Sequence, residues 1–341
     1  MHSSPARSRS IARTSTVLAA LALACGADPG SSASSTSGGA EASTDGAGSA
    51  SGAESASGTE STGGVSGAAP TTGSPDLPPA RACNGHAELC TRRFDEVAFP
   101  CTHNAFAARD DGFQQVNANQ RHGVAQQLAD GVRCMMLDVS DDDGTTVLCH
   151  GGCVFGRLEH AAVLADIAAF LEQHPDEVLT IIYQDDLSAD RVVGDLEAAG
   201  LAARVYTHEA GAAWPTLASM IDADTRLFVT AENGGPPPAW FHHVWDLSWD
   251  TPYSFHSVDE FTCALNRGSA GNDLFLVNHW LSTVLDTPSE PDAATANAFD
   301  VLHGRATQCQ REAGQLPNFL AVDFYDQGDL FAVVAALNGL G

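Results

Sequence analysis

Two hydrophobic patterns alternate along residues 82–341. Short, nearly continuous apolar runs predict buried strands, and apolar positions three or four residues apart predict amphipathic helices. The run at residues 178–183 is apolar at almost every position, which is typical of a parallel strand covered on both faces. Further strands are predicted at residues 97–103, 132–139, 146–150, 226–230, 274–278 and 318–324.

Helices are predicted between these strands. The segment that ends at His174 carries its apolar side chains on one face, and other helices end at Gly131, Gly200 and Asn338. Alternating strands and helices predict one α/β domain at residues 81–341, and we expect a single (β/α) barrel. A doubly wound open sheet is the alternative, but no Gly-x-Gly-x-x-Gly turn follows the first strand.

The first 80 residues have a different composition. Arginines precede an apolar run in residues 1–24, which is the pattern of a secretory signal peptide. The stretch that ends at Cys25 resembles a bacterial lipobox, in which the cysteine is lipidated after cleavage. Residues 25–80 are rich in Ser, Gly, Ala and Thr and predict a disordered linker. We expect an exported protein anchored to the bacterial cell envelope through lipidated Cys25, with plain secretion as the alternative.

The charge balance restricts the partners. The chain carries 16 basic residues, all of them arginine, against 43 acidic ones, so its formal net charge is −27. This charge argues against a nucleic-acid partner, and it means that an anionic substrate needs local positive groups or a metal ion. We expect a monomer.

Eight cysteines follow Cys25, and an even number in an exported chain predicts disulfides. Spacing does not determine how they pair. We expect local pairs Cys83–Cys90 and Cys149–Cys153 and long-range pairs Cys101–Cys134 and Cys263–Cys309. Zinc binding by Cys149 and Cys153 is the alternative, but no second close Cys/His pair has the spacing of a zinc finger.

Polar residues stand where the predicted strands end: Thr102-His103-Asn104, Asp138, His150-Gly151-Gly152, Gln184-Asp185-Asp186 and Asp323. In a (β/α) barrel these ends converge on one mouth, where catalytic groups lie. Each residue alone is more often a helix cap or a packed polar group. Two histidines together with several acids, however, are what acid–base catalysis on a phosphate ester requires.

These strings also resemble a known family. Thr102-His103-Asn104 and residues 131–139, 148–152 and 175–182 resemble, in this order, the X-region of phosphatidylinositol-specific phospholipase C. Residues 317–325 are similar to the end of its secreted phosphodiesterase branch. The resemblance implies a distorted TIM barrel that cleaves the diester between glycerol and inositol phosphate. It further implies that His103 is the general base, that His150 is the general acid and that Asp323 orients His103.

A metal ion is also implied by the resemblance. Calcium-dependent relatives carry Asn beside the first histidine and an acid-x-Asp pattern on the second strand. Asn104 and Asp138 match these positions, and with Asp185 they are the predicted ligands of Ca²⁺, with Mg²⁺ as the alternative. Met136 and Gln184 stand where two acidic ligands are expected, so the match is incomplete.

Three other features of the sequence are less specific. The run at residues 141–144 has part of a calcium-loop pattern but is better explained as a solvated turn, because no glutamate follows at the required offset. Aromatic residues gather between residues 240 and 255, where we expect satellite core rather than a membrane-touching rim or a sugar-binding wall. Arg267 is a candidate phosphate contact, whereas strand alternation directs Arg133 away from the mouth.

The expected substrate is a phospholipid or inositol-phosphate diester. Two alternatives remain open. One is a related barrel that acts on glycerophosphodiesters or sphingolipids. The other is a non-catalytic binding lipoprotein, which is suggested by Met136, by Gln184 and by the absence of lysine.

Overall fold

The computed structural model describes residues 81–150 and 153–341. The expectations for the signal peptide, for lipidated Cys25 and for the linker at residues 25–80 lie outside the described residues, as do Gly151 and Gly152.

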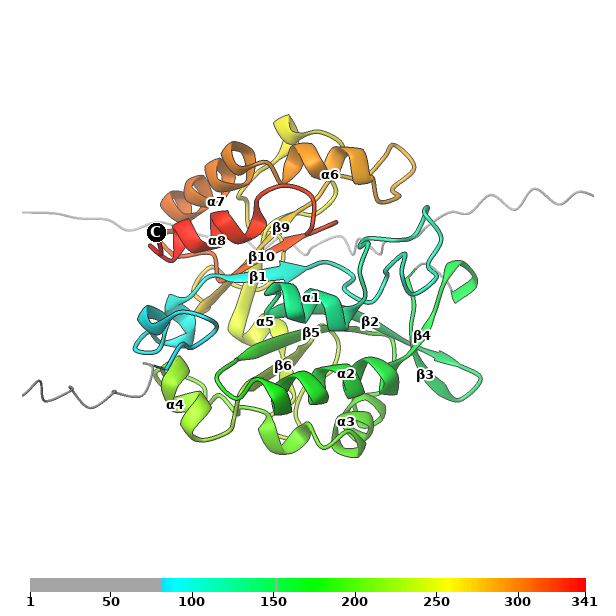
Figure 1. The fold of residues 1–341 in the computed structure, drawn as a ribbon, viewed down its shortest axis with the longest axis vertical. Coiled ribbons are helices and arrows are strands. Elements are labelled where there is room, and N and C mark those ends of the chain that lie inside the picture. The colour runs from blue at the N-terminus through cyan, green and yellow to red at the C-terminus, as the bar shows by residue number, and fades with distance from the viewer. Residues whose placement is uncertain (1–80, 151–152) are drawn as a thin grey trace, which may run out of the picture. The chain divides into compact units, whose positions relative to one another are not determined.

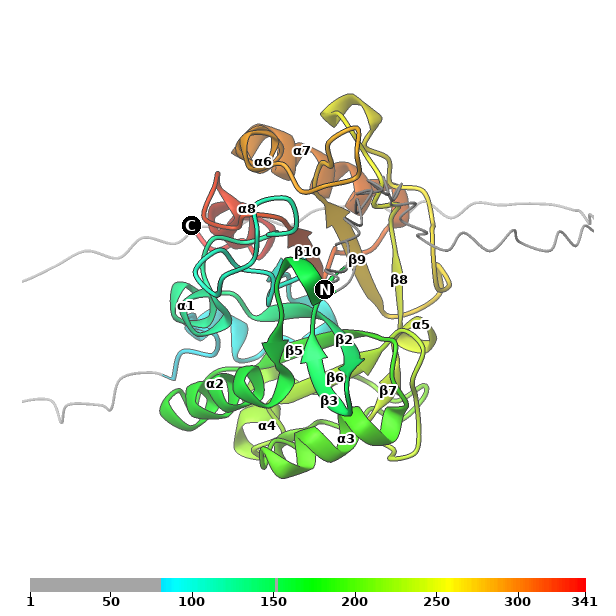
Figure 2. The ribbon, with the colours of Figure 1, turned by 90° about the vertical axis from the view of Figure 1, so that its right-hand side faces the viewer.

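The described chain is built around a curled parallel sheet (Figure 1). Its strands follow the order β7-β6-β5-β2-β1-β10-β9-β8, with every neighbouring pair parallel. These strands are β1 (Phe99–Thr102), β2 (Cys134–Asp142), β5 (Leu179–Asp185), β6 (Leu227–Ala231), β7 (His242–His243), β8 (Ser248–Asp250), β9 (Leu274–His279) and β10 (Phe319–Val322). The sheet order begins at β7 and ends at β8, so the barrel is distorted at this seam, as Figure 2 shows. The expected α/β barrel is thereby confirmed.

One predicted strand differs in its role. The segment at residues 146–150 was expected to be a barrel strand, but β3 (Thr145–Leu148) pairs antiparallel with β2, and β4 (Leu158–Glu159) pairs antiparallel with β3. Of the predicted solvated turn at residues 141–144, Asp141 and Asp142 are the last residues of β2, and Asp143 and Gly144 make the turn to β3 with positive φ angles. Because β3 runs back along β2, it returns the chain to the carboxyl end of the sheet.

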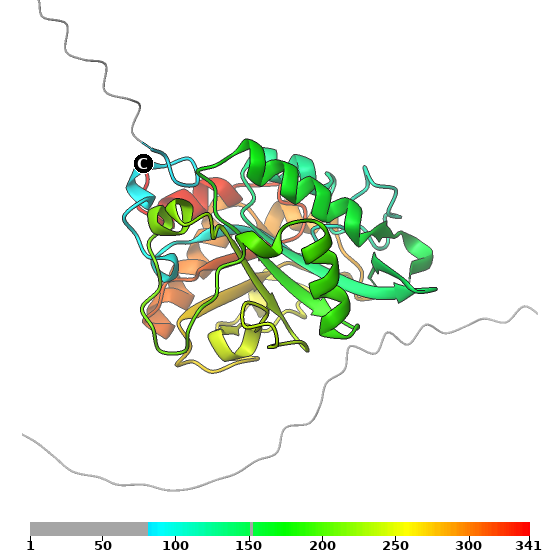
Figure 3. The ribbon, with the colours of Figure 1, turned by 90° about the horizontal axis from the view of Figure 1, so that it is seen from below.

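Eight helices of the described residues surround the sheet, most of them on its outer face. They are α1 (Val124–Asp130), α2 (His160–Gln173), α3 (Ala189–Ala198), α4 (Leu217–Asp222), α5 (Val244–Leu247), α6 (Glu290–Ala296), α7 (Phe299–Ala313) and α8 (Leu330–Leu337). Figure 3 shows α2 and α3 side by side along the sheet, and α7 packs beside α8. Short 3₁₀ helices lie at Ala87–Leu89, Phe94–Glu96, Cys153–Phe155, Ala202–Arg204 and Val258–Glu260. No helix of the described residues is long and apolar enough to cross a membrane.

Alternation along the strands separates two cores. On β2, Met135, Leu137 and Val139 pack with the apolar faces of α1 and α2. Cys134 and Met136 on the same strand face the barrel interior. Asp138 continues this inner set by alternation, at the position where the strand reaches the mouth. The period of two therefore decides which polar side chains enter the mouth.

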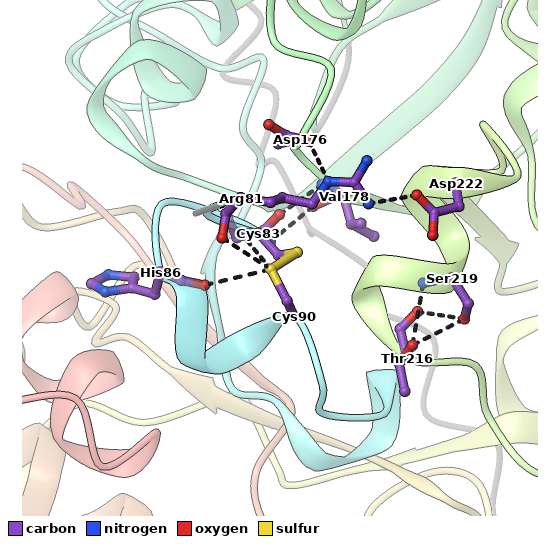
Figure 4. Close-up of a disulfide and its surroundings, with 10 residues drawn as sticks. Arg81, Cys83, His86, Cys90, Asp176, Val178, Thr216, Ser219 and Asp222 are labelled. Carbon is purple, nitrogen blue, oxygen red and sulfur yellow. Dashed lines mark hydrogen bonds and ion pairs between the residues drawn. A yellow bond between two sulfur atoms is a disulfide. The ribbon is translucent and has the colours of Figure 1, made fainter. Parts of the chain in front are cut away.

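All four expected disulfides are present. They join Cys83–Cys90, Cys101–Cys134, Cys149–Cys153 and Cys263–Cys309, which excludes the zinc alternative for Cys149 and Cys153. Figure 4 shows the Cys83–Cys90 bridge beside Arg81, whose guanidinium contacts Asp176 at 3.1 Å and Asp222 at 2.5 Å. The cross-link and these ion pairs attach the start of the described chain to the amino-terminal side of the barrel, away from the mouth.

Candidate active site

His103 follows the last residue of β1 and lies at the mouth. Its Nδ1 contacts Oδ1 of Asp323 at 2.8 Å, and Asp323 directly follows β10, the strand that pairs with β1. The Asp323 side chain is only 3% exposed, whereas that of His103 is 17% exposed. A buried carboxylate that accepts from Nδ1–H leaves Nε2 of His103 with a free lone pair. The structure therefore places Asp323 against His103, which is the contact that the family resemblance implied.

His150 reaches the same mouth from the end of β3. Its Nδ1 contacts Oδ2 of Asp138 at 2.7 Å, and its side chain is 29% exposed. Burial by itself lowers the pKa of His150. The hydrogen bond and the charge of Asp138, with a smaller contribution from the charge of Asp323, outweigh burial and raise this pKa above its ordinary value of 6.5. His150 therefore holds a proton more readily than an ordinary histidine does.

Asn104 lies between the two histidines in a left-handed conformation, with φ of 44°. With its amide nitrogen toward Asp138, it donates to both carboxylate oxygens at 3.1 Å. The amide oxygen then lies 3.3 Å from Nδ1 of His150 and 3.3 Å from Nε2 of His103. Because both rings contact one atom of the same side chain, they lie within reach of a single phosphate group.

A second polar layer holds this arrangement, and the sequence analysis missed it. Asn119 donates to Oδ1 of Asp323 at 3.0 Å. Gln120 donates to the carbonyl oxygens of His103 and Val322, at 2.8 and 3.1 Å. Both residues are buried. Their signal in the sequence was the polar string Asn117-Ala118-Asn119-Gln120 in the loop after the first strand, where no helix or strand was predicted.

Trp280 is another residue that the sequence analysis missed. Its ring stacks on the imidazole of His103, with centroids 3.8 Å apart and an interplanar angle of 7°. Trp280 directly follows β9 and is 6% exposed. The indole therefore fixes the plane of the His103 ring, while Asp323 fixes its tautomer.

A charged cluster lies at the ends of β6 and β8. Arg267 contacts Glu232 at 2.8 Å and Asp250 at 2.6 Å, and its guanidinium lies over the rings of Trp245 and Tyr253, 4.2 and 5.0 Å from their centroids. Tyr253 also lies beside Trp280, which connects this cluster to His103. Arg267 was a candidate phosphate contact, and in this structure two carboxylates hold it.

Glu232 follows β6 at the same edge. Burial raises its pKa to about 7 and outweighs the attraction of Arg267, and the charges of Asp138, Asp250 and Asp185 raise it further. Glu232 was not among the predicted site residues. The rule of polar residues at strand ends could have found it, because it stands two positions after the predicted strand 226–230.

The other predicted positions fall as follows. Arg133 points away from the mouth, as expected, and contacts Glu177 at 2.6 Å. In the aromatic segment, Phe241, Trp249 and Phe255 belong to apolar clusters, which confirms the expected satellite core.

The predicted metal ligands do not come together as a set. Asn104 and Asp138 are adjacent, but Asp185 lies in register with Val139, one residue beyond Asp138, and alternation therefore places it on the opposite face of the sheet. Oδ1 of Asp185 accepts from the backbone N–H of Asn233 at 2.8 Å, and burial raises the pKa of this carboxyl group. Among the described residues, no group of three or more His, Cys, Asp or Glu side chains could hold a metal ion.

The orientation of Asn104 adds to this disagreement. Oδ2 of Asp138 contacts Nδ1 of His150, and both of its carboxylate oxygens accept from the amide nitrogen of Asn104. The donor set therefore does not fit Ca²⁺ or Mg²⁺, each of which takes six or more oxygen ligands, partly from water.

The fold and the two carboxylate-backed histidines at the mouth define a TIM-barrel protein of the phospholipase C type. The model of the PI-PLC X family matches residues 89–338, and the chain belongs to this family.

Curated relatives of this chain include proteins named for the same domain. A PI-PLC X domain-containing protein of Arthroderma benhamiae is 28% identical over 76% of this chain and 90% of its own length. Another from Arabidopsis thaliana is 29% identical over 72% of this chain and 62% of its own length. A further A. benhamiae relative, 27% identical over 80% of this chain and 67% of its own length, is described as an uncharacterized secreted protein.

Solved structures share the fold. Phosphatidylinositol-specific phospholipase C from Listeria monocytogenes superposes with a TM-score of 0.52 at 18% identity, over 74% of this chain and 95% of that enzyme. The enzyme from Staphylococcus aureus gives a TM-score of 0.54 at 14% identity, over 77% of this chain and 99% of that enzyme.

Proposed function

We propose that the protein is a phosphodiesterase that removes the phosphorylated head group of a phospholipid, with inositol phospholipids as the first candidates. The observation that carries this proposal is the pair of histidines, each with a carboxylate on Nδ1, that share Asn104 as a neighbour. Membership of the PI-PLC X family supports the substrate class.

His103 is the general base in this proposal. Asp323 accepts from its Nδ1–H, so Nε2 accepts the proton of the head-group hydroxyl next to the phosphate. The oxygen of this hydroxyl attacks phosphorus, and the bond from phosphorus to the glycerol oxygen breaks. Trp280 and Asn119 hold the imidazole and its carboxylate during this transfer.

His150 is the general acid. It gives its Nε2 proton to the departing glycerol oxygen, so the products are a cyclic phosphate and diacylglycerol. The raised pKa of His150 favours its protonated form, which this role requires. The imidazolium also offsets part of the phosphate charge, and no step in this scheme uses a metal ion.

The relative described as a secreted protein supports export of this chain. We propose that lipidated Cys25 keeps the exported enzyme at the cell envelope, with plain secretion as the alternative. Labelling with a radioactive fatty acid tests this, since label that is retained by wild type and absent from Cys25→Ser supports the anchor.

Head-group release across lipid classes tests the proposed reaction. We expect release from phosphatidylinositol, a cyclic inositol phosphate visible by phosphorus NMR, and the same rate with and without EDTA. Release that EDTA abolishes would restore the cation to the mechanism. Activity confined to choline lipids or glycerophosphodiesters would support the related-barrel alternative. No turnover of any lipid by the wild type would leave only a binding role.

A further inference from the structure

His150 does not stand on a strand of the barrel, unlike the other catalytic side chains of the proposed reaction. His103 and Asp323 directly follow β1 and β10, which are neighbours in the parallel sheet. His150 comes two positions after Leu148, the last residue of β3, and β3 is an antiparallel strand outside the barrel order. Hydrogen bonds of the parallel sheet therefore do not hold the main chain of His150, and other contacts have to do so.

A disulfide spans the position of His150. It joins Cys149 to Cys153, four positions apart, and His150 is the first residue inside it. The sequence continues after His150 with two glycines, the residue type that leaves the backbone the most freedom. The N–H of Cys149 donates to the carbonyl of Asp138 at 3.3 Å, so one end of the bridge is attached to the strand that carries the partner of His150. The cross-link therefore restricts the chain where the general acid stands.

The loop after β1 holds the other end of this segment. Cys153 begins a 3₁₀ helix, and the carbonyl of Phe155 in that helix accepts from the N–H of Gln114 at 2.9 Å. The side chain of Asn117, in the same loop, is buried and donates to the carbonyl of His150 itself at 2.7 Å. The main chain of His150 is therefore held by the disulfide on one side and by the amide of Asn117 directly.

The ring of His150 needs this hold. Its side chain is 29% exposed, and its Nδ1 contacts Oδ2 of Asp138 at 2.7 Å. His103 has in addition the indole of Trp280 stacked on its ring. A catalytic group that is displaced by about 1 Å can lose a factor of about 100 in rate. Because a shift of the main chain carries the ring with it, contacts to the main chain of His150 act on proton transfer.

We propose that the Cys149–Cys153 disulfide and Asn117 are positioning elements for the general acid, which hold the main chain of His150 so that its ring stays against Asp138 and faces the departing oxygen. The inference rests on the proposed function, because the role of His150 as an acid comes from there. The sulfur atoms take no part in the reaction, and Asn117 contacts the carbonyl of His150 rather than its ring. Loss of either element should therefore impair proton donation and spare the other steps.

The disulfide is tested with the double substitution Cys149→Ser with Cys153→Ser in the full exported chain. The control is Cys83→Ser with Cys90→Ser, which removes another short-range disulfide, on the amino-terminal side of the barrel. In each bridge one cysteine is buried and the other is partly exposed, so the two removals are comparable.

Asn117→Ala tests the second element, because it removes the amide that holds His150 and leaves the disulfide in place. Its control is Asn338→Ala, which removes another buried amide that donates to a backbone carbonyl, that of Ala98, at 2.8 Å. Ala98 precedes β1 and lies at the end of the strand away from the mouth.

Two monomeric esters separate proton donation from the other steps. A glycerol ester needs a proton on its leaving group, whereas a p-nitrophenyl ester does not. We expect kcat of the disulfide variant to fall about 10- to 100-fold on the glycerol ester, with KM nearly unchanged, and less than about threefold on the p-nitrophenyl ester. Asn117→Ala should show the same selectivity with a smaller loss, about 5- to 20-fold. Both controls should keep the wild-type ratio of the two turnover rates.

Equal fractional losses on the two esters would show a merely structural role and would overturn the inference, and so would full activity of both variants on the glycerol ester. A selective loss in only one variant would remove the other element from the proposal. If the disulfide variant does not fold, Asn117→Ala decides the question, because it keeps the bridge.

Nitrogen NMR of the His150 ring separates this inference from the proposed function. Its Nδ1 signal reports the contact with Asp138, and it should change in both test variants and in neither control. A wild type that turns over neither ester would contradict the proposed function, and such a change in the Nδ1 signal would still support the positioning of His150. An Nδ1 signal that stays at its wild-type position in both test variants would overturn the inference.

Discussion

At the residue scale, each histidine depends on the carboxylate behind it. Asp323 and Asp138 make the same contact, to Nδ1, and they do so from β10 and β2, which pair on either side of β1. The same contact serves two roles, because Asp323 leaves a free lone pair on His103 and Asp138 raises the pKa of His150.

Asp138→Asn tests the role of this charge on His150. An asparagine keeps the shape and can still accept from Nδ1–H, but it removes the charge that raises the pKa of His150. We expect kcat at pH 8 to fall about 10- to 100-fold and the alkaline limb of the pH–rate profile to move to lower pH. Asp141→Asn, at the exposed end of β2, is the control. An alkaline limb that stays in place would contradict this account of His150.

Glu232 predicts a pH dependence of stability. Its pKa is about 7 in the folded protein and 4.5 as an ordinary glutamate, so the folded form favours the proton. Below pH 4.5 the protonated side chain of Glu232 makes its full contribution to the stability of the fold. This contribution is lost as the pH rises through 7. Relative to Glu232→Gln, the free energy of unfolding of the wild type should fall by about 3 kcal/mol between pH 4.5 and pH 8. Urea unfolding at both pH values measures the difference, and a constant difference would contradict the prediction. Glu88→Gln, on the surface, is the control.

Several site residues were within reach of sequence reasoning and others were not. His103, His150 and Asp323 stand in recognisable strings at strand ends. The contact between Asp138 and His150 was not predictable. Strand alternation shows on which face of the sheet the Asp138 side chain lies, but it does not show which histidine the side chain contacts. Trp280 carried no polar signal, and its role depends on its stacking on His103, a residue 177 positions earlier in the chain.

At the element scale, long apolar strands were predicted well and short ones were not. The predicted strands at 178–183 and 274–278 correspond to β5 and β9 within one or two residues. The strands β7 and β8, of two and three residues, are too short to give a periodic pattern. The antiparallel direction of β3 could not be predicted either, because hydrophobic periodicity does not distinguish a parallel strand from an antiparallel one.

The charged cluster around Arg267 requires a glycine at position 268, where the chain passes close to β8. Its φ is 82°, and a Cβ atom there would lie 2.2 Å from the carbonyl oxygen of Ser248, on β8. Gly268→Ala should therefore destabilise the fold by about 2–3 kcal/mol and disturb the neighbouring Arg267. Gly271→Ala, in the same loop, meets no atom closer than 3.9 Å and should change stability little. Urea denaturation compares the two variants, and equal midpoints would contradict the packing argument.

At the scale of the whole molecule, the barrel brings residues that are far apart in the sequence to one mouth. The strand β1 supplies His103 and the last strand, β10, supplies Asp323, while the β2–β3 hairpin returns His150 to the same place. The barrel was predictable from alternating elements.

Leaving-group dependence tests the central assignment, in which His103 is the base and His150 the acid. A p-nitrophenyl phosphodiester needs no protonation of its leaving group, whereas a glycerol ester does. Turnover of both esters is measured for His103→Ala and His150→Ala. We expect His103→Ala to lose about 10²- to 10⁴-fold on both esters, and His150→Ala to lose that much on the glycerol ester but less than about tenfold on the p-nitrophenyl ester. Equal losses on both esters for His150→Ala, or full activity of either variant on the glycerol ester, would contradict the assignment.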